Sequence, residues 1–403
     1  MKALIFNINV PKYLALQLLG RINRKYFFDG PFATVKMDDV PEPGLPGQDW
    51  VKLKTRLCGF CGSDLNLIQV KDSPMAEPFT SFPCIFGHEV CAQVVQTGSA
   101  VTNCQKGDLV TINPILSCAP RGISPQCPVC ASGRPGNCER FAEGGFAPGM
   151  FTGICSDVGG GFAEFMVVHK SQVYKVPSGV SPEAAVLTEP LAVALQAVLD
   201  NRPGESDRVL VIGGGVIGAM IVKAIRGLGI GCTITVVEPS AFNAEYARRS
   251  GANHVSPGNI LDTTVRITGA RAYKPMLGER ILQGGFDRVF DTVGHSPTLQ
   301  AALIAAAGCG TISLVGIGNK VTFDPTPLWL KLQTVKGCYG YGYNETPQGR
   351  KHAFEIALDL MGAGKIQLDD MLTHTFPIER YRELIGVNMS KGAHKAIKTA
   401  VKF

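Results

Sequence analysis

The sequence predicts an α/β protein in which an irregular β-rich domain precedes a doubly wound domain of alternating strands and helices. Residues 40–170 contain short β-type runs separated by Gly and Pro, whereas residues 182–315 alternate apolar runs with helical patterns. A strand-like segment at Ala393–Val401 follows, and we expect it to rejoin the β-rich domain. The expected domains are 1–185 with 345–403, and 186–344.

The composition is that of an ordinary globular enzyme or binding protein. The 403 residues suffice for two cores, and 45% are hydrophobic and 18% charged. The net charge of +6 is spread along the chain, and the densest basic run, Arg21–Lys25, ends in aromatic residues, so no nucleic-acid partner is indicated. The apolar patch Tyr13–Leu19 is too short to cross a membrane and no cleavage site follows it. We therefore expect no membrane partner and a cytoplasmic protein.

Individual elements follow from the same patterns. The β-rich domain is expected to contain strands at Trp50–Arg56, Val90–Val95, Asp108–Ile112 and Phe162–Val168. Residues 182–199 are expected to form a helix, with Ser181 as N-cap and Pro182 in the first turn. The strands expected next are Val209–Ile212, Thr233–Val237, Phe286–Phe290 and Thr311–Val315, and the helices are Val216–Leu228, Phe242–Ser250 and Arg350–Met361. Alternation of this kind indicates a parallel βαβ series.

A glycine-rich turn begins the first of these βαβ units. Gly213, Gly215 and Gly218 follow an apolar strand and open a helix that begins with Val216 and Ile217. In that context the first glycine permits the tight turn, the second allows a pyrophosphate to approach the backbone, and the third allows close helix–strand packing. The helix N-terminus favours phosphate. The segment therefore predicts a dinucleotide site.

Glu238 lies 20 residues after Gly218, at the end of the next strand. A carboxylate there accepts hydrogen bonds from ribose hydroxyls and repels a 2′-phosphate, which favours NAD over NADP. NADP is not excluded, because Arg248 and Arg249 follow closely. The alternative is that Glu238 is a surface residue of a structural βαβ unit.

Cys61, His88 and Glu89 have the donor types that zinc takes as ligands. Three protein ligands with an open position are typical of a catalytic site. His88 and Glu89 are adjacent and cannot both face a metal from a regular strand, so a turn after Gly87 is needed. Otherwise Glu89 lies behind the ligands, and another carboxylate or water completes the site.

Glu189 is the best candidate for that extra carboxylate, since it lies in an apolar helical stretch near the domain junction. The alternative for Glu189 is an ion-paired hinge residue. Asp64 is expected to orient the histidine ligand. Alternatively, Cys61 is a buried free thiol and not a ligand. We expect four other cysteines to be free thiols of this kind: Cys58, Cys84, Cys91 and Cys104.

Together these motifs resemble the zinc-dependent medium-chain dehydrogenase/reductase family, and its polyol and threonine dehydrogenase branch in particular. Cys61–Asp64 and Gly87–Glu89 resemble the two zinc motifs, and Glu189–Leu191 resembles the segment whose glutamate approaches or ligates the zinc. Gly159–Glu164 is similar to the end of the β-rich domain, and Asp291–Gly294 to a cofactor loop, which implies a cofactor contact at Val293. The resemblance implies a GroES-like catalytic domain, a Rossmann NAD-binding domain with the active site between them, and a homodimer or homotetramer.

The chain departs from that family pattern in three places. Pro11–Gly30 is an extra segment, which could cover the cleft or form an oligomer contact. Asn66 replaces the usual relay histidine and cannot titrate near neutral pH, so a proton would leave from Ser63 through water, ribose hydroxyls or another histidine. In the structural zinc lobe Ser124 replaces the first of four cysteines. Either Cys118 completes a site with Cys127, Cys130 and Cys138, or the lobe has lost its metal.

The predicted reaction is reversible oxidation of a secondary alcohol with NAD(P), assisted by zinc. Ser63 accepts or relays the alcohol proton, and Phe60, Phe86, Met150 and Phe151 are candidates for an apolar substrate pocket. The partners are then a small alcohol or ketone and the cofactor. Two alternatives are a zinc-free quinone or enoyl reductase of the same fold, and a non-catalytic cofactor-binding protein.

Overall fold

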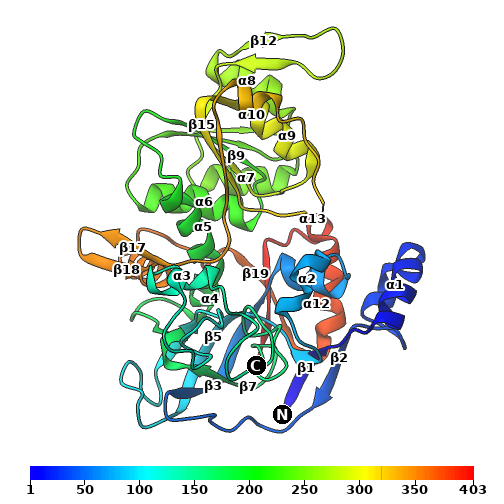
Figure 1. Ribbon diagram of the computed structural model, residues 1–403, viewed down its shortest axis with the longest axis vertical. Helices are drawn as coiled ribbons and strands as arrows, with labels where there is room; N and C mark the ends of the chain where they lie inside the picture. Colours follow the sequence, from blue (N-terminus) through cyan, green and yellow to red (C-terminus); the bar gives the residue numbers. More distant parts are fainter. Residues whose placement is uncertain (319) are drawn as a thin grey trace. The chain divides into compact units, whose positions relative to one another are not determined.

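The computed structural model describes residues 1–318 and 320–403 (Figure 1). The chain forms two compact units, Met1–Glu189 with Tyr341–Phe403, and Pro190–Gly340. We predict that residues 1–185 and 345–403 form the catalytic domain and that residues 186–344 bind the cofactor; this assignment stays a prediction.

The first unit is built on a seven-stranded sheet. Its order is β19 (Leu372–Pro377), β20 (Lys398–Lys402), β3 (Trp50–Phe60), β5 (Glu89–Thr97), β6 (Leu109–Ile112) and β8 (Val173–Lys175), with β7 (Phe165–His169) also paired to β3. The four strands predicted for this region are present, and β3 runs on to Phe60. The last strand does rejoin this sheet, because β20 pairs antiparallel with β3. Its predicted start was wrong, since α13 (Lys391–His394) occupies the beginning of that segment.

A smaller sheet holds the N-terminal segment. It has the order β2 (Val35–Asp39), β1 (Lys2–Phe6) and β4 (Cys84–Ile85). The extra segment between β1 and β2 forms α1 (Val10–Ile22) and the 3-10 turn η1 (Arg24–Phe27), at the periphery of the unit (Figure 1). Asn9 caps α1 by accepting from the Lys12 N–H at 2.9 Å. Leu16 and Phe27 fix the segment, because both are buried in the core of this unit.

Short helices and one hairpin complete the first unit. They are α2 (Gly62–Ile68), η2 (Pro74–Phe79), α3 (Pro128–Ala131), η3 (Pro135–Asn137), η4 (Lys170–Gln172), α4 (Pro182–Ala185), β17 (Tyr343–Thr346), β18 (Gly349–His352), α11 (Ala353–Gly362), η5 (Ile378–Arg380) and α12 (Tyr381–Met389). The helix predicted over 182–199 is divided in two, α4 and α5 (Thr188–Asp200). Ser181 caps the first part as predicted, since its Oγ accepts from the Ala184 N–H at 3.0 Å.

The second unit contains a six-stranded sheet in which every pair is parallel. Its order is β11 (His254–Ser256), β10 (Thr233–Val237), β9 (Arg208–Ile212), β14 (Phe286–Asp291), β15 (Ala306–Leu314) and β16 (Thr334–Gly337). The connecting helices are α6 (Val216–Gly227), α7 (Ala241–Arg249), α8 (Ile260–Thr268), α9 (Ser296–Ala305) and α10 (Thr326–Leu330), and a hairpin is formed by β12 (Arg271–Tyr273) and β13 (Ile281–Gln283).

This strand order confirms the doubly wound fold. The first strand in the sequence, β9, lies in the middle of the sheet, and the order reverses between β9 and β14. Ligands of such folds bind at the carboxyl ends of the strands beside this reversal. The central strands are apolar and fully buried, as expected for a parallel sheet covered on both faces: Val209, Leu210 and Val211 in β9, and Val289 and Phe290 in β14. Among the residues described, no helix has the length and apolar character needed to cross a membrane.

Candidate active site

Cys61 lies at the junction of β3 and α2. Its backbone N–H donates to the Asp64 Oδ2 at 2.7 Å, and this bond closes a capping box at the start of the helix. Asp64 is buried, so its carboxylate is fixed in place. The sequence Cys-Gly-Ser-Asp is therefore a strand-to-helix turn that holds the Cys61 thiol and the Ser63 hydroxyl at the end of β3.

His88 and Glu89 lie where the neighbouring strand, β5, begins, directly after the turn at Gly87. Gly87 has φ +93°, and a Cβ there would come within 2.6 Å of the Phe162 ring, so only glycine fits. Because β5 begins at Glu89, His88 is outside the regular strand and both side chains can face the same point. Ligand atoms of Cys61, His88 and Glu89 all lie within 4.8 Å of one another.

The donor set of this cluster fits zinc. Sulfur, imidazole nitrogen and carboxylate oxygen are its usual ligands. His88 Nδ1 and Glu89 Oε2 are buried, and neither has a hydrogen-bond partner among the described residues. Buried polar atoms without partners are costly, and a bound cation would satisfy the carboxylate oxygen. Asp64 Oδ1 lies 3.5 Å from His88 Nδ1, at the outer limit of a hydrogen bond, which suits a carboxylate that orients the ring.

Charges around His88 favour its protonated form when no metal is present. Burial opposes the charge, but the carboxylate of Asp64 and the sulfur of Cys61 outweigh burial and raise the His88 pKa well above its ordinary value. Metal binding must therefore displace a proton from this ring. On the other side of the ring, Ser63 Oγ lies 3.5 Å from His88 Nε2, so the hydroxyl is directly beside the cluster.

Two residues that the sequence reasoning missed hold Glu89 in position. Lys398, on β20, forms a fully buried ion pair with Glu89 Oε1. Burial opposes the Lys398 charge, but Glu89 outweighs it and raises the lysine pKa. Gly59, paired with Glu89 across the two strands, leaves room for the carboxylate, because a Cβ there would come within 2.1 Å of Glu89 Oε2. A lysine inside an apolar terminal strand was the available sequence signal for Lys398.

Glu189 is buried in the first turn of α5 but is not a member of the three-residue cluster. Its Oε1 accepts a hydrogen bond of 3.0 Å from the Tyr341 hydroxyl. Burial raises the pKa of Glu189 to about 7, and the charges of His88 and Glu89 also act on this carboxylate. Its predicted role as a ligand stays a prediction, and in this structure its oxygen is bound to Tyr341.

The four cysteines of the predicted structural lobe come together. Ligand atoms of Cys118, Cys127, Cys130 and Cys138 lie within 4.8 Å of one another, and all four side chains are buried. The Sγ atoms of Cys118 and Cys138 are 3.6 Å apart. Four converging sulfurs match a closed tetrahedral zinc site. Cys118 thus takes the place that Ser124, an exposed residue, cannot fill.

Backbone donors surround the sulfurs of this lobe. N–H groups of Cys127, Cys130 and Arg140 point at the sulfurs of Cys118, Cys127 and Cys138, each at 3.4 Å. Burial opposes ionisation of Cys127, but N–H donors from Glu139 and Cys130 outweigh it and lower the Cys127 pKa to about 7. The buried Arg121 fastens the surrounding loop by donating to five carbonyls, those of Leu116, Glu143, Phe146, Ala147 and Gly149.

The glycine turn of the second unit has the shape of a phosphate cradle. Gly213 has φ +92°, and a Cβ on Gly218 would come within 1.9 Å of the Gly213 carbonyl oxygen. A Cβ on Gly215 would meet nothing within 4 Å, so the space there is open to a ligand. Val216 and Ile217 form the first turn of α6, whose N–H groups face that space.

Glu238 follows β10 and borders a cavity of about 650 Å³ together with Gly213 and Val293. Its oxygens accept from the N–H groups of Gly214 and Ser240, each at 2.7 Å. The carboxylate is therefore held against the glycine turn rather than left free at a strand end. These residues fit a dinucleotide whose pyrophosphate lies on the turn and whose ribose lies near Glu238.

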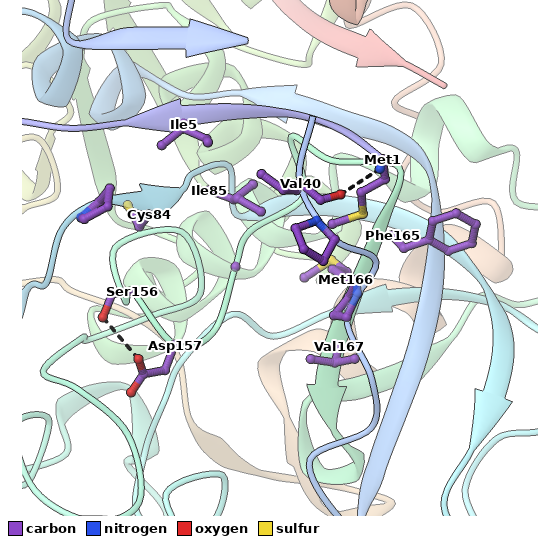
Figure 2. Close-up of a pocket in the computed structure, with 14 residues that line it drawn as sticks. Met1, Ile5, Val40, Cys84, Ile85, Ser156, Asp157, Phe165, Met166 and Val167 are labelled. Carbon is purple, nitrogen blue, oxygen red and sulfur yellow. Dashed lines mark hydrogen bonds between the residues drawn. The ribbon is translucent and has the colours of Figure 1, made fainter. Parts of the chain in front are cut away.

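A second hollow, of about 260 Å³, lies in the first unit and is shown in Figure 2. Its lining is mainly apolar, and its polar groups bond to one another: Met1 to Val40, and Ser156 to Asp157. None of the predicted site residues lines it. Of the proposed substrate walls, Phe60 and Phe86 were wrong, because both are 1% exposed and pack in the core. Phe151 lies against the His88 ring, with centroids 5.0 Å apart.

Comparison with known proteins agrees with this geometry. Residues 47–178 match the family described as Alcohol dehydrogenase GroES-like domain, and residues 216–360 match Zinc-binding dehydrogenase. The chain is 29% identical to (R,R)-butanediol dehydrogenase of Bacillus subtilis, over 84% of this chain and 88% of that protein. It is also 29% identical to L-threonine 3-dehydrogenase of Pyrococcus horikoshii, over 86% and 88%.

A solved structure extends the likeness to the fold. A zinc-binding dehydrogenase from Sinorhizobium meliloti bound to NADP superposes with a TM-score of 0.71 at 26% identity, over 92% of this chain and 95% of that one. The chain belongs to the zinc-containing medium-chain alcohol dehydrogenase family. It is an NAD(P)-linked, zinc-dependent dehydrogenase, which sets aside the zinc-free reductase and the non-catalytic binding protein.

Proposed function

We propose that the protein oxidises a secondary alcohol of the polyol type, reversibly, with NAD as the preferred cofactor. The observation that carries the proposal is the convergence of Cys61, His88 and Glu89, with the Ser63 hydroxyl beside His88. Relatives that act on butanediol and threonine support the choice of a secondary alcohol, since their names denote such substrates.

Each side chain around the reacting alcohol has a separate role in the proposed reaction. When bound, zinc supplies a Lewis acid that lowers the pKa of an alcohol, and the nicotinamide supplies a hydride acceptor. Cys61, His88 and Glu89 would hold the metal. Asp64 orients His88, and Lys398 keeps the Glu89 carboxylate in place. Phe151, lying against His88, places an apolar surface near the substrate.

Ser63 is the group best placed to move the proton. Its hydroxyl can accept from the substrate and donate onward. Asn66, in the same helix, has no titratable proton, so release beyond Ser63 runs through water or cofactor hydroxyls. Alcohols that present a neighbouring hydroxyl can extend this chain of hydrogen bonds, which favours diols and polyols over simple alcohols.

A substrate panel tests the proposal. Vicinal diols, sugar alcohols, amino alcohols and cyclic secondary alcohols are compared by kcat/KM with NAD, against primary alcohols of equal carbon number. We expect turnover of secondary alcohols, with diols or polyols preferred. Turnover confined to primary alcohols would refute the substrate class while leaving the dehydrogenase activity intact.

The preference for NAD rests on Glu238. A 2′-phosphate near this carboxylate would meet like charge, and such juxtaposition costs several kcal/mol. The nearby Arg248 is paired with Glu245, and Arg249 lies over the Tyr246 ring, so both arginines have other partners. We expect kcat/KM to favour NAD by roughly 100-fold and Glu238→Ser to reduce that ratio. Equal use of both cofactors by the native enzyme would contradict the assignment.

We also propose a homodimer or homotetramer. Strand β16 is the last strand of its sheet, and all four of its residues are exposed. Trp329, Leu330 and Leu332 beside it are at least half exposed. An open edge flanked by apolar side chains is suited to a second copy of the chain. Sedimentation analysis is expected to show an oligomer, and Trp329→Lys with Leu332→Lys is expected to dissociate it.

A further inference from the structure

The carboxylate of Glu189 is held by a tyrosine that nothing in the zinc motifs predicts. Tyr341 donates its hydroxyl hydrogen to Glu189 Oε1 at 3.0 Å. Both residues are buried, with exposed fractions of 3% for Tyr341 and 7% for Glu189. A buried hydrogen bond to a carboxylate is among the stronger kinds, so it fixes where that oxygen lies.

The packing around the Tyr341 ring leaves it little freedom to follow a movement of the Glu189 carboxylate. Phe354 packs edge-to-face on Tyr341 with centroids 4.9 Å apart, and His352 does so at 5.9 Å. His352 is itself fixed as the N-cap of α11. The hydroxyl is therefore presented to Glu189 from a closely packed aromatic group.

Glu189 and Tyr341 occupy a special place along the chain. Glu189 is the last residue before the chain passes into the second unit, and Tyr341 is the first after it returns. They are 152 residues apart in sequence. Their hydrogen bond thus joins the residue at which the chain leaves the first unit to the residue at which it returns.

Glu189 has the right chemistry for a metal ligand, yet it stands outside the ligand cluster. The cluster among the described residues consists of Cys61, His88 and Glu89 only. The charges of His88 and Glu89 nevertheless act on the buried Glu189 carboxylate, His88 favouring its ionised form and Glu89 opposing it. A second carboxylate, bound as a fourth protein ligand in the open position, would compete with substrate.

We propose that Tyr341 is a positioning residue that retains Glu189 outside the zinc ligands and so keeps the substrate position open. This deepens the proposed function, because it concerns the same metal site. Without the hydroxyl, Glu189 turns to the metal as an additional ligand. The metal is then held more firmly and substrate binds less well.

Tyr341→Phe tests the proposal, since it removes the hydroxyl and keeps the packed ring. Tyr343→Phe is the matched control, because this ring also packs on His352 but is 43% exposed. The first readout is zinc release to a chelator without substrate or cofactor, with the catalytic phase identified as the one missing in Cys61→Ser. The second is the visible spectrum of the cobalt-substituted protein, which reports a change in ligand number.

We expect Tyr341→Phe to slow release of the catalytic zinc by roughly tenfold, to change the cobalt spectrum and to raise KM more than it lowers kcat. Tyr343→Phe should do none of these. In the Glu189→Gln background, Tyr341→Phe should no longer change release. The proposal would be overturned if Tyr341→Phe released zinc at a rate within twofold of the native protein and left the cobalt spectrum unchanged. It would also be overturned if Tyr341→Phe slowed zinc release equally in the Glu189→Gln background. Neither metal measurement requires turnover, so their outcome does not depend on whether the proposed substrate class is correct.

Discussion

The cysteine lobe and the catalytic cluster are both suited to zinc but are built in opposite ways. The lobe takes its four sulfurs from one stretch of chain, Cys118 to Cys138, and backbone N–H groups donate to three of them. The cluster takes three different donors from the junction of β3 and α2 and from the start of β5, and depends on Lys398 near the other end of the sequence. One of its carboxylate oxygens, Glu89 Oε2, has no hydrogen-bond partner within the described part of the chain.

This difference separates a structural metal site from a reactive one. Four thiolate ligands fill the tetrahedral coordination of a zinc ion and leave no position for substrate. Three unlike donors with an open position leave a place for substrate, and the surrounding charges must then hold each ligand individually. We therefore expect damage to the lobe to reduce stability, and damage to the cluster to reduce activity.

The largest effect is expected for Cys61→Ala. Losing one of three ligands should remove the catalytic zinc and lower kcat/KM by at least about 1,000-fold. The protein should stay folded and keep one zinc per chain, in the lobe. Metal analysis and steady-state kinetics measure both, with Cys91→Ala as a control for a buried thiol outside either site. Full activity in a variant that lacks the catalytic zinc would contradict the zinc-assisted mechanism.

Cys127→Ser should produce the opposite pattern. Loss of the lobe zinc is expected to lower the free energy of unfolding by several kcal/mol, because metal binding there is coupled to folding of the loop. Chemical denaturation monitored by circular dichroism measures the loss, and kcat per folded, catalytic-zinc-bearing molecule should change less than threefold. A stable variant with impaired chemistry would show that the lobe serves the reaction.

Lys398→Met is expected to affect stability and metal binding together. Removing one member of a buried ion pair leaves the other charge unpaired, at a cost of about 3–5 kcal/mol. Bound zinc would relieve part of that cost through Glu89, so the destabilisation should be smaller in the zinc-loaded protein. Denaturation with and without zinc measures the difference. Lys402→Met on the same strand, at an exposed position, is the control and should be nearly neutral.

Lowering the pH should release zinc from both sites, and the dependence of zinc affinity on pH should be steeper at one site than at the other. Zinc takes a thiolate and a neutral imidazole as ligands, so binding at the cluster releases up to two protons, one from each ligand side chain. The pKa of His88 is raised in the metal-free protein, so its ring proton is one of them. The lobe must lose up to four thiol protons, since Cys127 has a pKa of about 7 and burial raises that of Cys138 to about 11. Each displaced proton weakens zinc binding roughly tenfold per pH unit. Competition titrations from pH 7.5 to 6 should give a steeper slope for the lobe; equal slopes would refute the proton count.

The sequence by itself determined the features that depend on local chemistry. The glycine turn at Gly213–Gly218 and the spacing of Cys127, Cys130 and Cys138 each act within a few residues, and the structure has them as predicted. The alternation of strands and helices likewise predicted the doubly wound sheet, because periodicity reports which face is buried.

Only the tertiary structure decided which distant side chains meet. Lys398 reaches Glu89, and Tyr341 reaches Glu189, across 309 and 152 residues. Phe60 and Phe86 turned inward to the core rather than to a substrate pocket. Cys118 replaced Ser124 because the loop held by Arg121 brings its sulfur to the other three. No local pattern encodes these contacts, since strand pairing and packing, which act over long separations, bring the partners together.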